Sequence, residues 1–108
     1  MYKINMKPLS VNDAWQGRRF KSTAYKVYET ELYYQLPKIK VPDWQLRLSI
    51  EAGISRQADI DNISKPFIDV LQATYWFNDK SIMLLQLHKV IVKKWEEYIS
   101  FEFNKYPC

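Results

Sequence analysis

The order of apolar and polar side chains along the 108-residue chain predicts four strands and two helices. Strict alternation over residues 44–51 is typical of a strand with one buried and one wet face, and Gly53 is expected to end it. Shorter alternations predict strands over 2–6 and 98–103, a further strand is expected over 82–92, and we expect the last two to form a hairpin. Half-wet strands of this kind need helices on only one face of the sheet.

Helical spacing of apolar residues predicts the two helices. Ser22 is a suitable N-cap for a helix that ends near Leu36, because Pro37 cannot continue it. A second helix is expected over roughly 64–74, starting just before Pro66, since proline fits best in a first turn. The order β-α-β-α-β-β indicates an α+β fold, with two helices packed on a small mixed, mostly antiparallel sheet.

Composition places the chain among ordinary globular proteins, as one domain over residues 1–108. Hydrophobic residues make up 47% of the chain, yet no apolar run approaches the roughly 20 residues of a membrane span. We therefore expect a cytoplasmic protein without a membrane partner. The single cysteine, Cys108, predicts no internal disulfide and no disulfide-linked partner. With His88 as the only histidine, a zinc site of nitrogen and sulfur ligands is excluded.

The net charge of +4 and a pI near 9.1 favour a polyanionic partner. Arg18, Arg19 and Lys21 flank Phe20 and follow Trp15 in a segment without regular periodicity. Cationic groups interleaved with aromatic rings suit phosphate contacts with nearby base stacking. A solvated basic loop is the alternative interpretation of the same segment.

Aspartates next to the second predicted helix are the strongest chemical signal in the chain. Asp59 and Asp61 are two residues apart, so in an extended segment both carboxylates face the same way. Asp79 follows the helix and reaches them only if the next strand packs alongside. Three carboxylates suit Mg²⁺, with Mn²⁺ as the alternative ion, and such an ion activates water against a phosphodiester. Lys65, one helical turn after Asp61, is placed to stabilise the charge that develops.

Each of these residues also has a structural interpretation. Asp61 is a suitable helix cap, Lys65 and Asp69 are spaced as an ion pair, and Asp79 suits a turn. Residue chemistry by itself leaves the catalytic and structural interpretations balanced. An EF-hand is excluded, because Ile63 stands at the fifth loop position, where a calcium ligand is required.

The central segment resembles a known family. Residues 59–71 read DIDNISKPFIDVL and residues 76–79 read WFND. This is similar to the signature of the RusA-type Holliday-junction resolvases of phages and prophages, D-x-D-N-x-x-K-x-x-x-D-x-L followed by an aromatic residue and a D-D or N-D pair. The sequence PLSVN at 8–12 resembles the opening turn of that family. The chain departs from the pattern in a connection to Asp79 that is one residue shorter, and in Ala58 where a basic residue is common.

The resemblance implies a Mg²⁺-dependent homodimeric endonuclease that nicks four-way DNA junctions symmetrically during recombination and repair. By motif position, the metal-binding catalytic residues would be Asp59, Asp61 and Asp79, and the catalytic lysine would be Lys65. The expected DNA contacts are Arg18, Arg19, Lys21, Arg56 and Lys65, with Arg56 standing in for the basic residue missing at position 58. Two alternatives remain: a branched-DNA-binding module with weak or lost cleavage, and an interaction domain whose aspartates only cap and pair.

Overall fold

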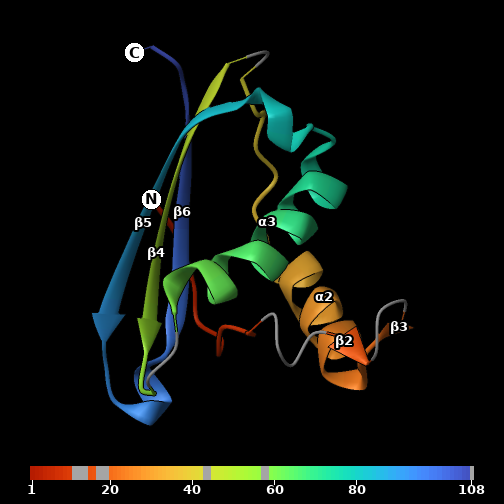
Figure 1. Cartoon of the computed structure of the whole chain (residues 1–108), viewed down its shortest axis with the longest axis vertical. Helices are drawn as coiled ribbons and strands as arrows, with labels where there is room; N and C mark the ends of the chain where they lie inside the picture. Colours follow the sequence, from red (N-terminus) through yellow and green to blue (C-terminus); the bar gives the residue numbers. More distant parts are fainter. Residues whose placement is uncertain (11–14, 17–19, 43–44, 57–58, 108) are drawn as a thin grey trace.

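A computed structural model provides the structure of the chain and describes residues 1–10, 15–16, 20–42, 45–56 and 59–107. Two helices pack on one face of a four-stranded sheet, and a short two-stranded ribbon stands apart from it (Figure 1). No helix in these residues is long and apolar enough to cross a bilayer. The elements are β1 (Tyr2–Ile4), β2 (Trp15–Gln16), β3 (Phe20–Lys21), α2 (Thr23–Gln35), β4 (Leu46–Ile54), α3 (Ile60–Tyr75), η1 (Asp79–Ser81), β5 (Ile82–Ile91), η2 (Lys94–Glu96) and β6 (Tyr98–Lys105).

The sheet is mixed, with strand order β1-β6-β4-β5. β6 pairs antiparallel with β1 and with β4, whereas β5 pairs parallel with β4 through the α3 crossover. The α+β class, the element order and the mixed sheet are therefore as predicted. The ribbon of β2 and β3 lies in the segment for which no regular structure was predicted.

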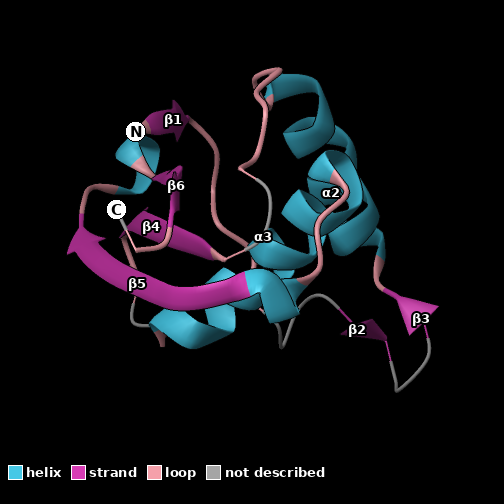
Figure 2. Ribbon diagram, turned by 90° about the horizontal axis from the view of Figure 1, so that it is seen from above, coloured by secondary structure: helices cyan, strands magenta, loops and turns pink. Residues whose placement is uncertain are grey.

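The predicted hairpin of the last two strands is wrong, because β4 lies between them. β4 is buried along most of its length: Leu48, Ile50 and Ala52 of the inner face are at most 1% exposed, and Ser49 of the face predicted to be wet is only 9% exposed. A strand this apolar is most stable in the middle of the sheet, where both of its edges and one face are covered. The chain after β5 therefore crosses the end of β4 before β6 returns on the other side (Figure 2).

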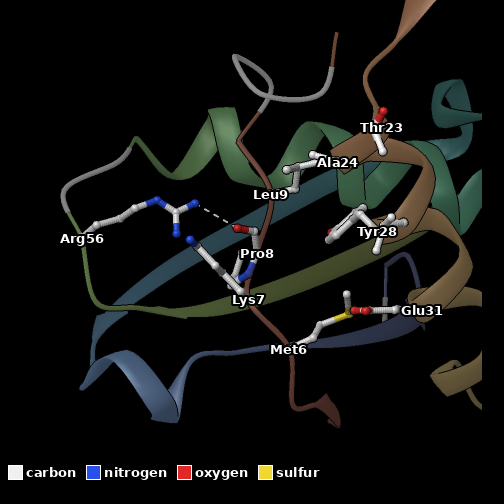
Figure 3. Close-up of a pocket in the computed structure, with 10 residues that line it drawn as sticks. Met6, Lys7, Pro8, Leu9, Thr23, Ala24, Tyr28, Glu31 and Arg56 are labelled. Carbon is white, nitrogen blue, oxygen red and sulfur yellow. Dashed lines mark hydrogen bonds between the residues drawn. The ribbon is translucent and has the colours of Figure 1, made fainter.

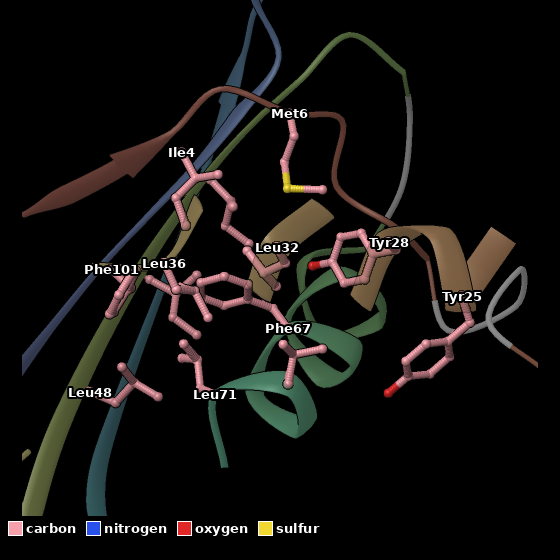
Figure 4. Packing of buried hydrophobic residues seen from close by; sticks show 13 residues of the cluster. Ile4, Met6, Tyr25, Tyr28, Leu32, Leu36, Leu48, Phe67, Leu71 and Phe101 are labelled. Atoms are coloured by element: carbon pink, nitrogen blue, oxygen red, sulfur yellow. The ribbon is translucent and has the colours of Figure 1, made fainter. Parts of the chain in front are cut away.

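The core lies between the sheet and the two helices. As predicted, Ser22 caps α2, and its hydroxyl accepts a hydrogen bond from the Tyr25 backbone N–H at 3.1 Å. Phe67 of α3 packs edge-on against Phe101 of β6, with ring centroids 5.5 Å apart (Figure 4). The predicted helical faces supply further members of this cluster, namely Tyr25, Tyr28 and Leu32 from α2 with its C-cap Leu36, and Val70 and Leu71 from α3.

Two element boundaries differ from the prediction. α3 begins at Ile60, a full turn earlier than expected, and Pro66 lies inside it as a buried residue. Burial of the helix on both sides of Pro66 outweighs the one backbone hydrogen bond that proline cannot donate. β4 likewise continues through Gly53 to Ile54. Gly53 does not end the strand: its missing side chain leaves the space that the Tyr98 ring of β6 occupies.

The face of the sheet opposite the helices carries polar side chains. The Tyr98 hydroxyl donates to Glu51 Oε2 at 3.0 Å, and His88 Nδ1 lies 2.9 Å from Glu51 Oε1. Partial burial raises the pKa of Tyr98, and its hydrogen bond to Glu51 adds to the shift. His88 is exposed on the surface of the sheet, and its recorded ion-pair partner is the Glu51 carboxylate.

Candidate metal and DNA site

Asp59 and Asp61 lie at the start of α3, just after the end of β4. Asp59 is the N-cap residue, with extended backbone (φ −73°, ψ 135°) and no side-chain capping bond. Asp61 is already within the first turn, where its Oδ1 accepts from the Asn62 backbone N–H at 3.0 Å. The expected extended geometry therefore holds for Asp59 and not for Asp61. Both residues are exposed, so both carboxylates are open to a ligand.

Asp79 lies at the opposite end of the same helix, as the first residue of η1. β5 does pack alongside β4, but in parallel, so that Leu46 pairs with Ile82 and Ile54 pairs with Ile91. Asp79 precedes the start of this ladder, and Asp59 follows its end (Figure 1). The nine residues of β4 span about 26 Å and the 16 residues of α3 about 24 Å, so Asp79 and Asp59 are separated by a distance of this order. Ligands of one ion lie only 2.0–2.6 Å from it.

One chain therefore does not bring Asp79 to the other two aspartates. Consistently, no group of three or more His, Cys, Asp or Glu side chains within the described ranges is arranged to hold a metal ion. The donor set still suits a hard cation, because carboxylate oxygens are the ligands that Mg²⁺ prefers. Asp59 and Asp61 would supply two of the three carboxylates of such a site, and Asp79 would have to come from another copy.

The basic residues named from sequence fall in different places. Lys65 is exposed on α3, one turn after Asp61, as the spacing predicted. Lys21 ends β3, and its backbone lies in the ribbon opposite Trp15. Arg18 and Arg19 lie outside the residues that the structure describes.

Arg56 is held by contacts within the fold. Its guanidinium donates to the Pro8 carbonyl at 2.9 Å (Figure 3). It also lies 3.4 Å from a carboxylate oxygen of Glu97. Glu97 is buried and also accepts from the Ser55 backbone N–H, so this ion pair fixes the turn after β4. Arg56 borders a pocket of about 570 Å³ together with Pro8, Leu9 and Tyr28. These contacts hold the Arg56 side chain against the fold, while its side chain remains 32% exposed.

Sequence reasoning treated Trp76 only as part of a motif, but the structure gives it an unusual position. Trp76 ends α3 in the left-handed region (φ 56°, ψ 48°), and 91% of the residue is exposed. Lys40 and Asn78 border the same groove. The backbone conformation was not readable from the sequence, because glycine is the residue that normally signals it.

Comparison with known protein families shows to which family the chain belongs. The family described as Endodeoxyribonuclease RusA matches residues 6–100, which is most of the chain and includes both ends of α3. The chain belongs to the RusA family. No curated protein matches it closely enough to add a further relative.

Membership in the RusA family gives the aspartate segment a chemical context. The family consists of endodeoxyribonucleases, and membership implies Holliday-junction resolvase activity and binding of branched DNA. Nucleases of this type generally use a divalent metal ion. The exposed carboxylates at the start of α3 lie within the matched range, as does Asp79.

Proposed function

We propose that this RusA-family chain is a Mg²⁺-dependent endonuclease that resolves four-way DNA junctions as a homodimer, in DNA recombination and repair. The observation that supports this most is the pair of exposed carboxylates, Asp59 and Asp61, at the start of α3 inside the family match. A carboxylate that only caps a helix accepts from the first-turn N–H groups. Asp59 makes no such bond, which favours a ligand over a cap.

The proposed metal ligands are Asp59, Asp61 and Asp79, holding Mg²⁺ or, alternatively, Mn²⁺. When bound, the ion supplies polarisation of the phosphodiester and an activated water. The chain's own contribution is to present oxygen ligands in a fixed arrangement and to orient the DNA backbone. Lys65, exposed one turn along α3, would place its ammonium against the phosphate and stabilise the negative charge that develops there.

A complete site requires Asp79 from a second copy, since one chain separates it from Asp59 by the length of α3. β5 is the edge strand of the sheet, ten residues long, with a free backbone edge. If two β5 strands pair antiparallel about a two-fold axis, the start of one strand meets the end of the other. This brings Asp79 of one copy towards Asp59 and Asp61 of the other.

The side chains of β5 support such a pairing. Met83, Leu84, Leu85 and Ile91 are 44%, 37%, 41% and 67% exposed. A long apolar edge strand associates readily unless it is covered, and no charged residue lies between Ile82 and Leu87. A two-fold dimer would contain two equivalent sites, which matches two symmetric cuts in a four-way junction.

DNA contacts in this proposal come from cationic residues near the two ends of the ladder. Lys65 lies beside the aspartates, and Arg18, Arg19 and Lys21 belong to the segment that precedes α2. The net charge of +4 supports attraction to the phosphate backbone. Arg56 would act indirectly, by fixing the turn that leads to Asp59.

The test uses a labelled four-way junction with Mg²⁺ and the variants Asp59→Asn and Asp61→Asn. We expect each variant to lose cleavage by at least about 10²-fold, because a neutral amide weakens the ion site, while junction binding persists. Asp69→Asn is a control, since Asp69 is a half-buried carboxylate in the middle of the same helix. Binding without Mg²⁺-dependent nicking by the wild-type protein would indicate a branched-DNA-binding module. Neither binding nor nicking would indicate an interaction domain.

Lys65→Ala in the same assay separates charge stabilisation from binding. We expect a loss of about 10²-fold in rate with little change in junction affinity, because the ammonium acts on the charge formed during the reaction. Lys26→Ala on the exposed side of α2 is the matched control. A loss confined to affinity would assign Lys65 to DNA contact alone.

A further inference from the structure

Trp76 is held in a conformation that costs energy and gains no burial. A bulky residue with φ of 56° is an outlier, and helices that end in the left-handed region usually place glycine there. Burial of the indole does not offset this cost, because 91% of the residue is exposed. Backbone outliers that persist in this way cluster at binding and catalytic sites.

The residues on both sides of Trp76 are anchored. The Tyr75 hydroxyl donates to the Pro37 carbonyl at 2.6 Å, and burial raises the pKa of Tyr75 to about 12, so it remains a donor. Phe77 packs edge-on against Phe103, with ring centroids 5.2 Å apart. Trp76 thus projects from a fixed backbone, and little conformational freedom is lost when its ring binds a partner.

A groove of about 490 Å³ lies beside the indole. It is lined by Lys40 and Val41 from the segment after α2, and by Trp76, Asn78 and Ser81 from the segment between α3 and β5. Lys40 is exposed, so its ammonium is accessible next to an aromatic ring. An aromatic platform with an adjacent cation is the arrangement that binds unstacked nucleotides, with the base on the ring and the phosphate on the cation.

We infer that Trp76 and Lys40 bind one unstacked nucleotide at the branch point of the DNA. The inference rests on the proposed function and adds a site that selects branched over linear DNA. In a linear duplex every base is stacked on its neighbours, so none is free to stack on the indole. Asp79 follows Trp76 by three residues, which places this nucleotide beside the proposed metal site.

The polar character of the groove favours a nucleotide over a protein partner. Aromatic anchors of protein interfaces lie in apolar surroundings from which charges are depleted. Here Lys40, Asn78 and Ser81 line the groove together with apolar residues, and polar atoms make up most of its exposed lining. The net charge of +4 also favours a negatively charged occupant.

The experiment measures binding of a four-way junction and of a linear duplex of the same sequence, with Asp59→Asn present throughout to prevent cleavage. We expect Trp76→Ala to weaken junction binding about tenfold, within the range for loss of one base–aromatic stack, and to leave duplex binding unchanged. Trp76→Phe keeps a stacking face and should retain most of the affinity. Tyr34→Ala is the matched control, since Tyr34 is 80% exposed on α2. Lys40→Ala should reduce the slope of log affinity against log salt concentration for junction binding by about one, because one phosphate contact is lost.

Each other outcome overturns the inference. Equal losses on junction and duplex would make Trp76 a general DNA contact, and no loss on either would leave it without a role in binding. A dimer that dissociates in Trp76→Ala, measured by sedimentation, would assign the ring to an interface between copies. In these cases the parent protein still binds junctions. If the Asp59→Asn protein binds neither substrate and the wild-type protein does not cut the junction, the proposed function and the inference are both wrong.

Discussion

At the scale of single residues, the end of α3 combines strain with exposure. The Trp76 N–H still closes the helix by donating to the Gln72 carbonyl, and the Asp79 N–H donates to the Gln72 side chain at 3.3 Å. Gln72 therefore holds the backbone on both sides of the turn. In the connection from Leu71 to Asp79, Trp76 takes the left-handed conformation that glycine would adopt at lower cost.

Replacing Trp76 with glycine is expected to stabilise the fold. The left-handed conformation costs an L-residue roughly 1–2 kcal/mol, and glycine avoids most of this cost, so we expect a gain of about 1 kcal/mol in the free energy of unfolding. Urea denaturation measures it, with Trp76→Ala as the control that keeps the strain. A destabilised Trp76→Gly would mean that the indole contributes to folding. The expected combination of higher stability and weaker junction binding is typical of a residue kept for function.

At the scale of elements, β4 organises the molecule. It pairs with β5 on one edge and β6 on the other, and α3 starts within a few residues of its end. Gly53 lies near that end because the Tyr98 ring covers it, with Lys3 Nζ 4.5 Å from the ring centroid on the open face. The contacts of Tyr98 with Gly53 and Glu51 therefore tie β6 to the end of β4 that leads towards Asp59.

A side chain at position 53 should expel the Tyr98 ring. We expect Gly53→Ala to lower the free energy of unfolding by about 1–3 kcal/mol, because the added methyl group meets the ring. In a Tyr98→Ala background the same change should be neutral or slightly stabilising, since the clash is gone and alanine is favoured over glycine in a strand. Urea denaturation of the four proteins gives the coupling energy. Additive effects would contradict the close contact.

At the scale of the whole molecule, the parallel pairing of β4 and β5 separates the two halves of the proposed metal site. In Figure 1, α3 begins near the ends of β4 and β5 and leads to η1 at the other end of the sheet. The distance is a property of the topology, because a crossover between parallel strands returns the chain to the starting edge. In the proposed site, a second copy in the opposite orientation would supply Asp79 where Asp59 lies.

Mixing two inactive variants tests this arrangement. Asp59→Asn and Asp79→Asn are each expected to be inactive as homodimers. After subunit exchange, random pairing leaves one intact site in half of the dimers, so we expect about a quarter of wild-type nicking activity to return. The product should be a nick in one strand, because such a dimer has a single active site. A mixture that stays inactive, although mass spectrometry shows that heterodimers form, would contradict a site shared between copies.

Much of the fold was readable from the sequence because it depends on local patterns. Periodicity located α2 and the strands of the four-stranded sheet, residue type indicated the Ser22 cap, and the spacing from Asp59 to Leu71 pointed to the family. These features depend on neighbours within about one turn or one strand. The start of α3 was not predicted, because the cost of Pro66 in a helix is local whereas the burial that offsets it comes from the sheet.

The sequence by itself determined which groups are candidates for the chemistry: the carboxylates of Asp59, Asp61 and Asp79, a lysine one turn after Asp61, and a net charge of +4. Tertiary structure alone decided where those groups lie. Placing β4 between β5 and β6 removed the hairpin and set Asp79 at the far end from Asp59, since strand order is determined by which strand gains most from burial on both edges. The same packing, through Tyr75 and Phe77, holds Trp76 out in solvent.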